Sequence, residues 1–205
     1  MSATTLNFHH RLEPGTHPGR PPILLLHGTG GDETDLLPFG RTIAPGSALL
    51  AVRGKVLEQG MPRFFRRLAE GVFDEDDVRR RANELADFVA DAREAYQLSR
   101  PIAVGFSNGA NIAAAVLLLR PETLAGAVLL RAMTPLGEPP VADLTGTPVL
   151  IISGQMDPIV PAANAASLAA TLSNAGAVVQ ALTVAAAHGL SHRDVTLVRD
   201  WIAQL

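Results

Sequence analysis

A serine between two glycines is the clearest chemical signal in the sequence. Gly105-Phe106-Ser107-Asn108-Gly109 has the G-x-S-x-G spacing, which places a serine on a sharp strand-to-helix turn. Apolar residues 101–104 predict the strand before it, and the mostly apolar residues 110–119 predict the helix after it. Such a turn exposes the Ser107 hydroxyl and aims the helix N-terminus at a developing oxyanion, which predicts nucleophilic attack on a carbonyl. A serine N-cap in a glycine-rich turn is the structural alternative.

The partners of a serine nucleophile follow it in the chain, first an acid and then a histidine. Among the later carboxylates only Asp157 directly follows a predicted strand end, although an Asp-Pro turn would also explain it. Of the later histidines, His188 lies between the last predicted strand and the last predicted helix, whereas His192 begins that helix. We therefore predict Ser107 as nucleophile, His188 as base and Asp157 as acid, with His192 facing solvent or the rim.

A glycine-rich loop after residues 23–26 could supply a backbone amide that donates to the oxyanion. His27-Gly28-Thr29-Gly30-Gly31 follows that predicted strand, and the fold takes one amide donor from such a loop and one from the residue after the nucleophile. The predicted donors are the amides of Thr29 and Asn108, with His27 holding the loop. A nucleotide loop is the alternative, but neither the G-K-[ST] ending nor the dinucleotide spacing is present. This chemistry needs no metal and no cofactor.

These residues need a parallel sheet to position them. Short apolar runs without polar alternation predict buried strands at Ile23–Leu26, Ala48–Val52, Ile102–Phe106, Gly126–Leu130, Val149–Ile152 and Val178–Val184. Helical patterns at Leu36–Ile43, Asp76–Gln97, Asn108–Leu119, Ala162–Ala175 and His192–Leu205 separate most of them. The alternation predicts an α/β fold, a mostly parallel sheet with helices on both faces. A strand at Leu6–Arg11 is expected antiparallel at one edge.

Composition narrows the class of protein. The 205 residues suffice for one domain, 1–205, and 17 Lys+Arg against 20 Asp+Glu give a net charge of −3, which disfavours nucleic acid as a partner. The absence of cysteine excludes a thiolate nucleophile and a cysteine-ligated metal. The longest apolar run, 112–119, is too short to cross a membrane, and residues 1–15 contain no apolar signal run, so we expect no membrane partner and a cytoplasmic location.

The substrate cleft is expected beside residues 53–74, called the excursion below. This long connection leaves the carboxyl end of a predicted strand and is expected to be functional or to carry a short helix. Residues 131–147 are too few for a cap domain, which predicts an open cleft for small, short-acyl esters. The predicted substrate-binding residues are Arg53, Arg63, Phe64, Phe65, Met133 and Ile159. Arg66 is an alternative to Arg63 in facing a polar leaving group, and both phenylalanines could instead simply fasten the loop.

Four motifs together resemble the phospholipase/carboxylesterase family of small α/β-hydrolases, which includes acyl-protein thioesterase-like enzymes. They are residues 26–33, 105–110, 154–161 and 188–190. The excursion looks most like a bacterial subgroup of predicted carboxylesterases, some linked to aromatic-compound (hydroquinone) stress. The resemblance implies the α/β-hydrolase fold and ester hydrolysis, and it departs at Ala187, where glycine is expected.

Three functions remain open at this point. The first is a serine carboxylesterase that works through an acyl-enzyme intermediate, and the second is an acyl-thioesterase or lysophospholipase. The third is a catalytically silent scaffold that binds a small ligand. The natural ester, its acyl length, and the choice between a monomer and a homodimer also stay open.

Overall fold

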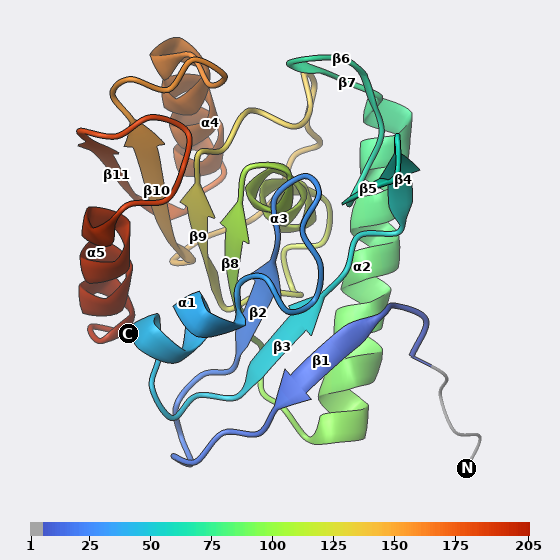
Figure 1. Ribbon diagram of the computed structural model, residues 1–205, viewed down its shortest axis with the longest axis vertical. Coiled ribbons are helices and arrows are strands. Elements are labelled where there is room, and N and C mark those ends of the chain that lie inside the picture. Colours follow the sequence, from blue (N-terminus) through green and yellow to red (C-terminus); the bar gives the residue numbers. More distant parts are fainter. Residues whose placement is uncertain (1–5) are drawn as a thin grey trace.

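A seven-stranded sheet forms the centre of the computed structural model, which describes residues 6–205 (Figure 1). The strand order is β1-β3-β2-β8-β9-β10-β11; β1 runs antiparallel to β3, and the other pairs are parallel. The strands are β1 (His10–Glu13), β2 (Ile23–Leu26), β3 (Leu49–Val52), β8 (Ile102–Phe106), β9 (Gly126–Leu130), β10 (Pro148–Gly154) and β11 (Val178–Val184). The carboxyl ends of the parallel strands therefore meet at one edge of the sheet.

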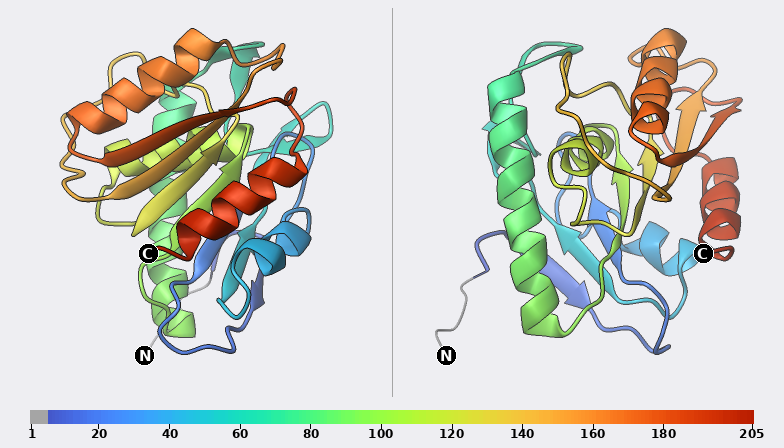
Figure 2. Two further views of the ribbon diagram at one scale, coloured as in Figure 1. Left: turned by 90° about the vertical axis from the view of Figure 1, so that its left-hand side faces the viewer. Right: turned by 180° about the vertical axis from the view of Figure 1, so that it is seen from behind.

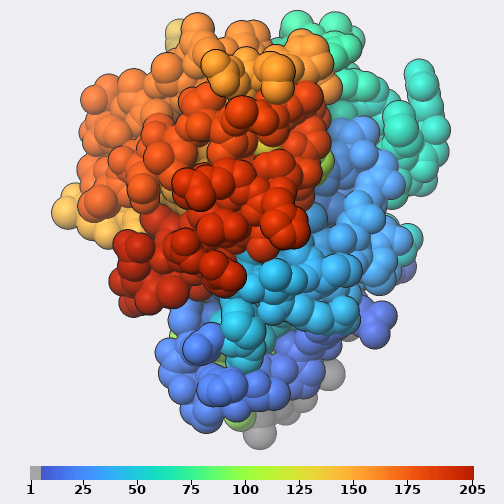
Figure 3. All heavy atoms as spheres, turned by 60° about the vertical axis from the view of Figure 1, so that its left-hand side comes forward, coloured from blue at the N-terminus to red at the C-terminus, as the bar shows by residue number. Residues whose placement is uncertain are grey.

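Helices cover both faces of this sheet (Figure 2). Helices α1 (Leu37–Ile43) and α5 (His192–Ile202) lie on one face, and their atoms adjoin at the surface (Figure 3). Helices α2 (Glu75–Tyr96), α3 (Asn108–Leu119) and α4 (Ala162–Asn174) lie on the other. Successive residues of β2 point to opposite faces: Leu24 joins the cluster under α2 and α3, while Leu25 joins the cluster under α1 and α5.

The helix ends near the site are fixed by their own sequence. The Asp74 side chain caps α2 by accepting from the Asp77 amide, and three acidic residues fill the first turn, which favours the positive end of the helix dipole. Ser191 caps α5 in a reciprocal capping box with Asp194. Both helices therefore begin at defined residues close to the carboxyl edge of the sheet.

The predicted α/β class and the order of its elements are confirmed, with most element ends shifted by only a few residues. The edge strand differs more, because it lies at His10–Glu13 rather than Leu6–Arg11. Phe8 is buried against Phe88, with ring centroids 5.1 Å apart, so this part of the chain packs on α2 instead of continuing the ladder. No helix in residues 6–205 is long and apolar enough to cross a membrane.

The excursion forms two small hairpins rather than the short helix expected as one alternative. The first pairs β4 (Val56–Glu58) with β5 (Met61–Arg63), and the second pairs β6 (Arg67–Ala69) with β7 (Val72–Phe73). The teal segment projects from the molecular surface in Figure 3. Residues 131–147 contain neither helix nor strand, in agreement with the prediction that no cap is inserted there.

Candidate active site

Ser107 sits on a strained turn between β8 and α3. Its φ is +52° and its ψ is −115°, a conformation that costs a residue with a side chain about 1–3 kcal/mol. The Ser107 amide donates to Leu130 O at 2.8 Å, which fixes the turn against β9. A Cβ on Gly105 would lie 2.4 Å from Gly109 O, and one on Gly109 would lie 2.0 Å from Leu26 O. Both glycines of the motif are therefore required by close backbone approach.

The three residues predicted for nucleophilic catalysis form one hydrogen-bonded chain. His188 Nε2 lies 2.9 Å from Ser107 Oγ, and His188 Nδ1 lies 2.8 Å from Asp157 Oδ2. Ser107 follows β8, Asp157 follows β10, and His188 follows β11. In Figure 1 the arrowheads of β8, β9 and β10 point to the edge where the red segment joining β11 to α5 also lies. The parallel sheet thus brings together residues far apart in the sequence.

The hydrogen-bond directions follow from the state of Asp157. Burial alone would raise its pKa, but hydrogen bonds from the Ile159 amide, from His188 and from the Val160 amide outweigh burial and lower that pKa. The ionised carboxylate only accepts, so His188 Nδ1–H must donate to it. Nε2 of the neutral ring is then the acceptor that receives the Ser107 hydroxyl proton.

Two backbone amides are available beside Ser107. Among the described residues, neither the Thr29 nor the Asn108 N–H donates to a backbone or side-chain acceptor. Asn108 begins α3, where the first amides of a helix have no intrahelical partner. Both residues line the same cleft as Ser107.

The loop that carries Thr29 is held by its neighbours. His27 is buried; its Nδ1–H donates to Gly28 O at 2.6 Å, and its Nε2 accepts from the Gly54 amide at 3.0 Å. The Gly30 amide donates to Pro62 O at 2.9 Å, and Arg63 Nη1 donates to Thr29 Oγ1 at 2.6 Å. The predicted role of His27 as a loop-holding residue agrees with these contacts.

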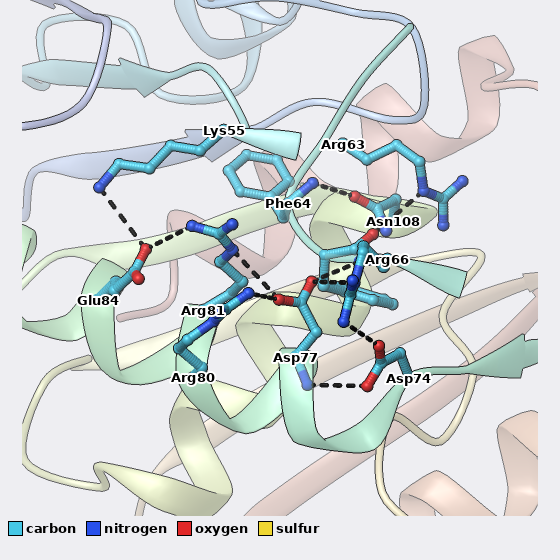
Figure 4. A network of polar contacts seen from close by, with 11 residues as sticks. Lys55, Arg63, Phe64, Arg66, Asp74, Asp77, Arg80, Arg81, Glu84 and Asn108 are labelled. Carbon is cyan, nitrogen blue, oxygen red and sulfur yellow. Dashed lines mark hydrogen bonds and ion pairs between the residues drawn. The ribbon is translucent and has the colours of Figure 1, made fainter. Parts of the chain in front are cut away.

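A polar network ties the excursion to α2 and α3 (Figure 4). The Phe64 amide donates to Asn108 Oδ1 at 2.7 Å, and the Arg66 amide donates to Asp77 Oδ2 at 2.8 Å. Burial alone would raise the pKa of Asp77, but hydrogen bonds from the Arg66 amide and Arg80 outweigh it and lower that pKa. Sequence reasoning missed Asp77, because an acid in the first turn of a helix is usually only a solvated charge. The network keeps the excursion close to Asn108.

The cleft beside Ser107 is small. Its volume is about 220 Å³, below the roughly 300–1,000 Å³ typical of pockets for drug-sized ligands. Its walls include apolar side chains and charged groups from the excursion. The lining residues are Thr29, Arg63, Arg67, Glu70, Gly71, Phe73, Phe106, Ser107, Asn108, Asn111, Arg131, Met133, Ile159, Val160 and His188.

Three of the six predicted substrate-binding residues line this cleft, namely Arg63, Met133 and Ile159. The structure does not place the other three there. Phe64 and Phe65 are buried in the core under α2, because apolar rings on a fastened loop gain more from packing than from facing water. Arg53 is ion-paired with Glu33, with Nη2 donating to Oε1 at 2.8 Å.

The arginines of the excursion divide between the cleft and the surface. Arg66 pairs with Asp74 at the surface, so Arg67 joins Arg63 in the cleft instead. His192 is exposed at the start of α5, as predicted.

Sequence reasoning also missed two buried polar residues. Asn111 Oδ1 accepts from the Met133 amide at 2.7 Å and fixes the chain after β9. Arg131 is fully buried and pairs with Asp194 at 2.8 Å. The sequence signal for Arg131 was its position directly after the apolar run 126–130, at the end of a predicted buried strand. Across residues 6–205, no group of three or more His, Asp or Glu side chains is arranged to hold a metal ion.

Comparison with known proteins places this site in context. A family model described as Phospholipase/Carboxylesterase matches residues 57–205. The protein named "Putative hydrolase MhqD" from Bacillus subtilis (strain 168) is 46% identical over 181 residues, covering 87% of this chain and 90% of that protein.

Two solved structures extend the likeness to the whole fold. The Bacillus cereus carboxylesterase is 42% identical, with a TM-score of 0.94, over 97% of this chain and 94% of that chain. A carboxylesterase from Mesorhizobium loti is 34% identical, with a TM-score of 0.93, over 98% of this chain and 97% of that chain. The expected α/β-hydrolase-type fold is thereby confirmed.

Proposed function

The chain belongs to the phospholipase/carboxylesterase family of hydrolases, and on that premise we propose that it is a serine carboxylesterase acting on small, short-acyl esters. The observation that carries the proposal is the hydrogen-bonded chain from Ser107 through His188 to Asp157, at 2.9 and 2.8 Å. Nucleophile, base and orienting acid within hydrogen-bond reach are the arrangement that acyl transfer requires.

Acylation begins with the Ser107 hydroxyl. Its Oγ attacks the ester carbonyl carbon while His188 Nε2 takes the hydroxyl proton, and the Asp157 carboxylate stabilises the resulting imidazolium. The carbonyl oxygen becomes an oxyanion, which accepts hydrogen bonds from the Thr29 and Asn108 amides. The intermediate then collapses: the carbon–oxygen bond to the leaving alcohol breaks, and His188 returns its proton to that alcohol. The acyl group remains on Ser107.

Deacylation repeats these steps with water. His188 Nε2 removes a proton from a water molecule as its oxygen attacks the acyl carbon. The second intermediate releases the carboxylic acid when its bond to Ser107 Oγ breaks, and the proton on His188 returns to that oxygen. The free serine is regenerated without a redox step, and water is the only reactant besides the ester.

The size of the cleft supports the substrate class. A volume of about 220 Å³ leaves little room for a long chain, and residues 131–147 add no cap that would enclose one. Arg63 and Arg67 add charged groups to a wall that also contains the apolar side chains of Met133 and Ile159. A small ester with a polar leaving group fits this combination.

Active-site titration tests the proposal directly. A fluorophosphonate should add one equivalent to Ser107, identified by mass spectrometry of the adduct peptide. Ser107→Ala should remain folded and lose hydrolysis of p-nitrophenyl acetate, while Ser173→Ala, which removes an exposed hydroxyl at the end of α4, should keep both hydrolysis and labelling at Ser107. An adduct on another residue would refute the assignment, and failure to hydrolyse any ester would favour a ligand-binding scaffold.

Further predictions about this chain remain to be tested alongside its activity. They are a single domain over residues 1–205, of which 1–5 lie outside the described residues, a cytoplasmic location, and the absence of a nucleic-acid partner.

A further inference from the structure

Arg131 is fully buried in the row of strand ends that carries the site. It directly follows β9, and its backbone φ of +56° is one that side-chain-bearing residues adopt rarely. Its amide donates to Ile152 O at 2.9 Å, which joins the ends of β9 and β10. Burying a guanidinium is costly unless its donors are bonded, so its partners indicate what the burial achieves.

The guanidinium donates to a carboxylate, to the loop that carries His188 and, from Nη1, to Ile152 O at 3.3 Å. Nη1 and Nη2 donate to the two oxygens of Asp194 at 2.8 and 2.9 Å. Nε donates to Ala187 O and Nη2 donates to Gly189 O, both at 3.1 Å. These two carbonyls belong to the residues immediately before and after His188. One planar group therefore hydrogen-bonds to the loop on both sides of His188.

Asp194 is itself held in place. Its side chain is buried, and its Oδ2 accepts from the Ser191 amide at 2.7 Å and from the Ser191 hydroxyl at 2.6 Å. Burial alone would raise the pKa of Asp194, but hydrogen bonds from Arg131 and Ser191 outweigh burial and lower that pKa. The carboxylate is an anchored anion at the start of α5, and it fixes the plane of the guanidinium.

The Met156 amide donates to Ala186 O at 3.0 Å, two residues before His188, but among the described residues no backbone amide donates to the Ala187 or Gly189 carbonyl. Ala187 and Gly189 are exposed, and a Cβ built on Gly189 would meet no atom within 4 Å. The hydrogen bonds from His188 to Ser107 and Asp157 still require the imidazole to be placed accurately, because a displacement of about 1 Å can reduce a rate about 100-fold. The hydrogen bonds from the Arg131 guanidinium to both flanking carbonyls meet this requirement.

We propose that Arg131 is a positioning residue that holds the His188 loop in its reactive geometry through the Ala187 and Gly189 carbonyls, with Asp194 as its anchor. The inference rests on the proposed function, in which His188 is the general base. Charge alone is not sufficient, because only a planar guanidinium can donate to the carboxylate and to both carbonyls at once.

Two variants remove the hydrogen bonds from Arg131 to the Ala187 and Gly189 carbonyls in different ways. Arg131→Lys keeps a cation for Asp194 but loses the fork of donors. Arg131→Met combined with Asp194→Asn removes both charges, so that no unpaired ion is buried, while the amide oxygen can still cap α5. In both we expect kcat for p-nitrophenyl acetate to fall about 10- to 100-fold, with KM within about threefold of wild type. The low-field proton resonance of His188 Nδ1–H should weaken in parallel.

A stability control separates positioning from general destabilisation. Leu168→Ala opens the core under α4, away from the loop, and should lower the melting temperature while keeping kcat per folded molecule. Ser191→Ala removes one contact to Asp194 and should fold, with kcat lowered about two- to fivefold at unchanged KM, as for one lost hydrogen bond.

The outcomes are distinct. Folded Arg131 variants with kcat within threefold of wild type would overturn the proposal, as would an equal kcat loss in Leu168→Ala. If the Arg131 variants do not fold, unchanged kcat in Ser191→Ala would assign the Arg131–Asp194 pair to stability alone. His188→Ala tests the proposed function separately. Full activity in that variant would show that His188 is not the general base, whatever the Arg131 variants do.

Discussion

The volume of the cleft sets an expected acyl length. Its volume of about 220 Å³ is smaller than the roughly 300–1,000 Å³ of pockets for drug-sized ligands. The first carbons of an acyl chain are buried in such a cleft, whereas the later carbons of a long chain stay in water and add no binding energy. Each methylene buried in the transition state contributes about 0.8 kcal/mol, or about a fourfold gain in kcat/KM. For p-nitrophenyl esters we therefore expect kcat/KM to peak between about two and six acyl carbons and then to fall.

Enlarging the cleft should move this optimum. Met133→Ala removes three side-chain heavy atoms from the wall, so we expect the peak to shift by about two to three carbons at about 0.8 kcal/mol each. Leu57→Ala is the matched control, because Leu57 is exposed on β4 and does not line the cleft. The assay compares matched esters from acetyl to palmitoyl below their micelle concentrations. A steady rise to palmitoyl would refute the reasoning and favour a thioesterase or lysophospholipase.

The remaining predictions concern three histidines and one phenylalanine. His188→Ala should lose several orders of magnitude in kcat, and His192→Ala should stay within about tenfold of wild type; reversed effects would mean that the base is misassigned. Burial lowers the pKa of His27 below 6.5, so the folded chain binds fewer protons than the unfolded chain at acidic pH. The contribution of His27 to the free energy of unfolding should be complete above about pH 6.5 and should decrease below that pH by up to about 1.4 kcal/mol per pH unit. Urea titrations at several pH values should show that the free energy of unfolding depends less on pH in His27→Gln than in wild type. Equal pH dependence in the two proteins would argue against a buried neutral ring at His27. Phe64→Ala should lower the free energy of unfolding by about 3–5 kcal/mol while leaving the acyl-length optimum in place; a shifted optimum would make Phe64 part of the cleft wall.

Parts of the molecule were predictable because their signals are local. The strand at Ile23–Leu26 is apolar on both faces, and Ser107 lies in a motif whose glycines are required by backbone contact. Asp157 and His188 followed from chain order and strand ends. Arg131 and Asp194 could not be paired in advance, because 63 positions separate them and neither lies in a motif.

The side of a loop that a residue faces is another matter the sequence leaves open. Phe64 and Phe65 are adjacent rings on a segment beside the site, a pattern equally typical of a cleft wall and of a packed core. The edge strand shows the same ambiguity, since burial of Phe8 against Phe88 depends on the distant helix α2. Each of these choices is made by tertiary packing.

The position of β11 links activity to the local unfolding of one strand. β11 is the last strand of the sheet, it pairs only with β10, and of its seven residues only Val184 is buried. Strands at such an edge open at lower free energy than strands at the centre. Opening β11 would carry away the chain that leads into His188 while the Ser107 turn, between β2 and β9, keeps its shape. Gentle heating should thus inactivate the enzyme before circular dichroism records unfolding, with hydrogen exchange fastest at the β11 amides.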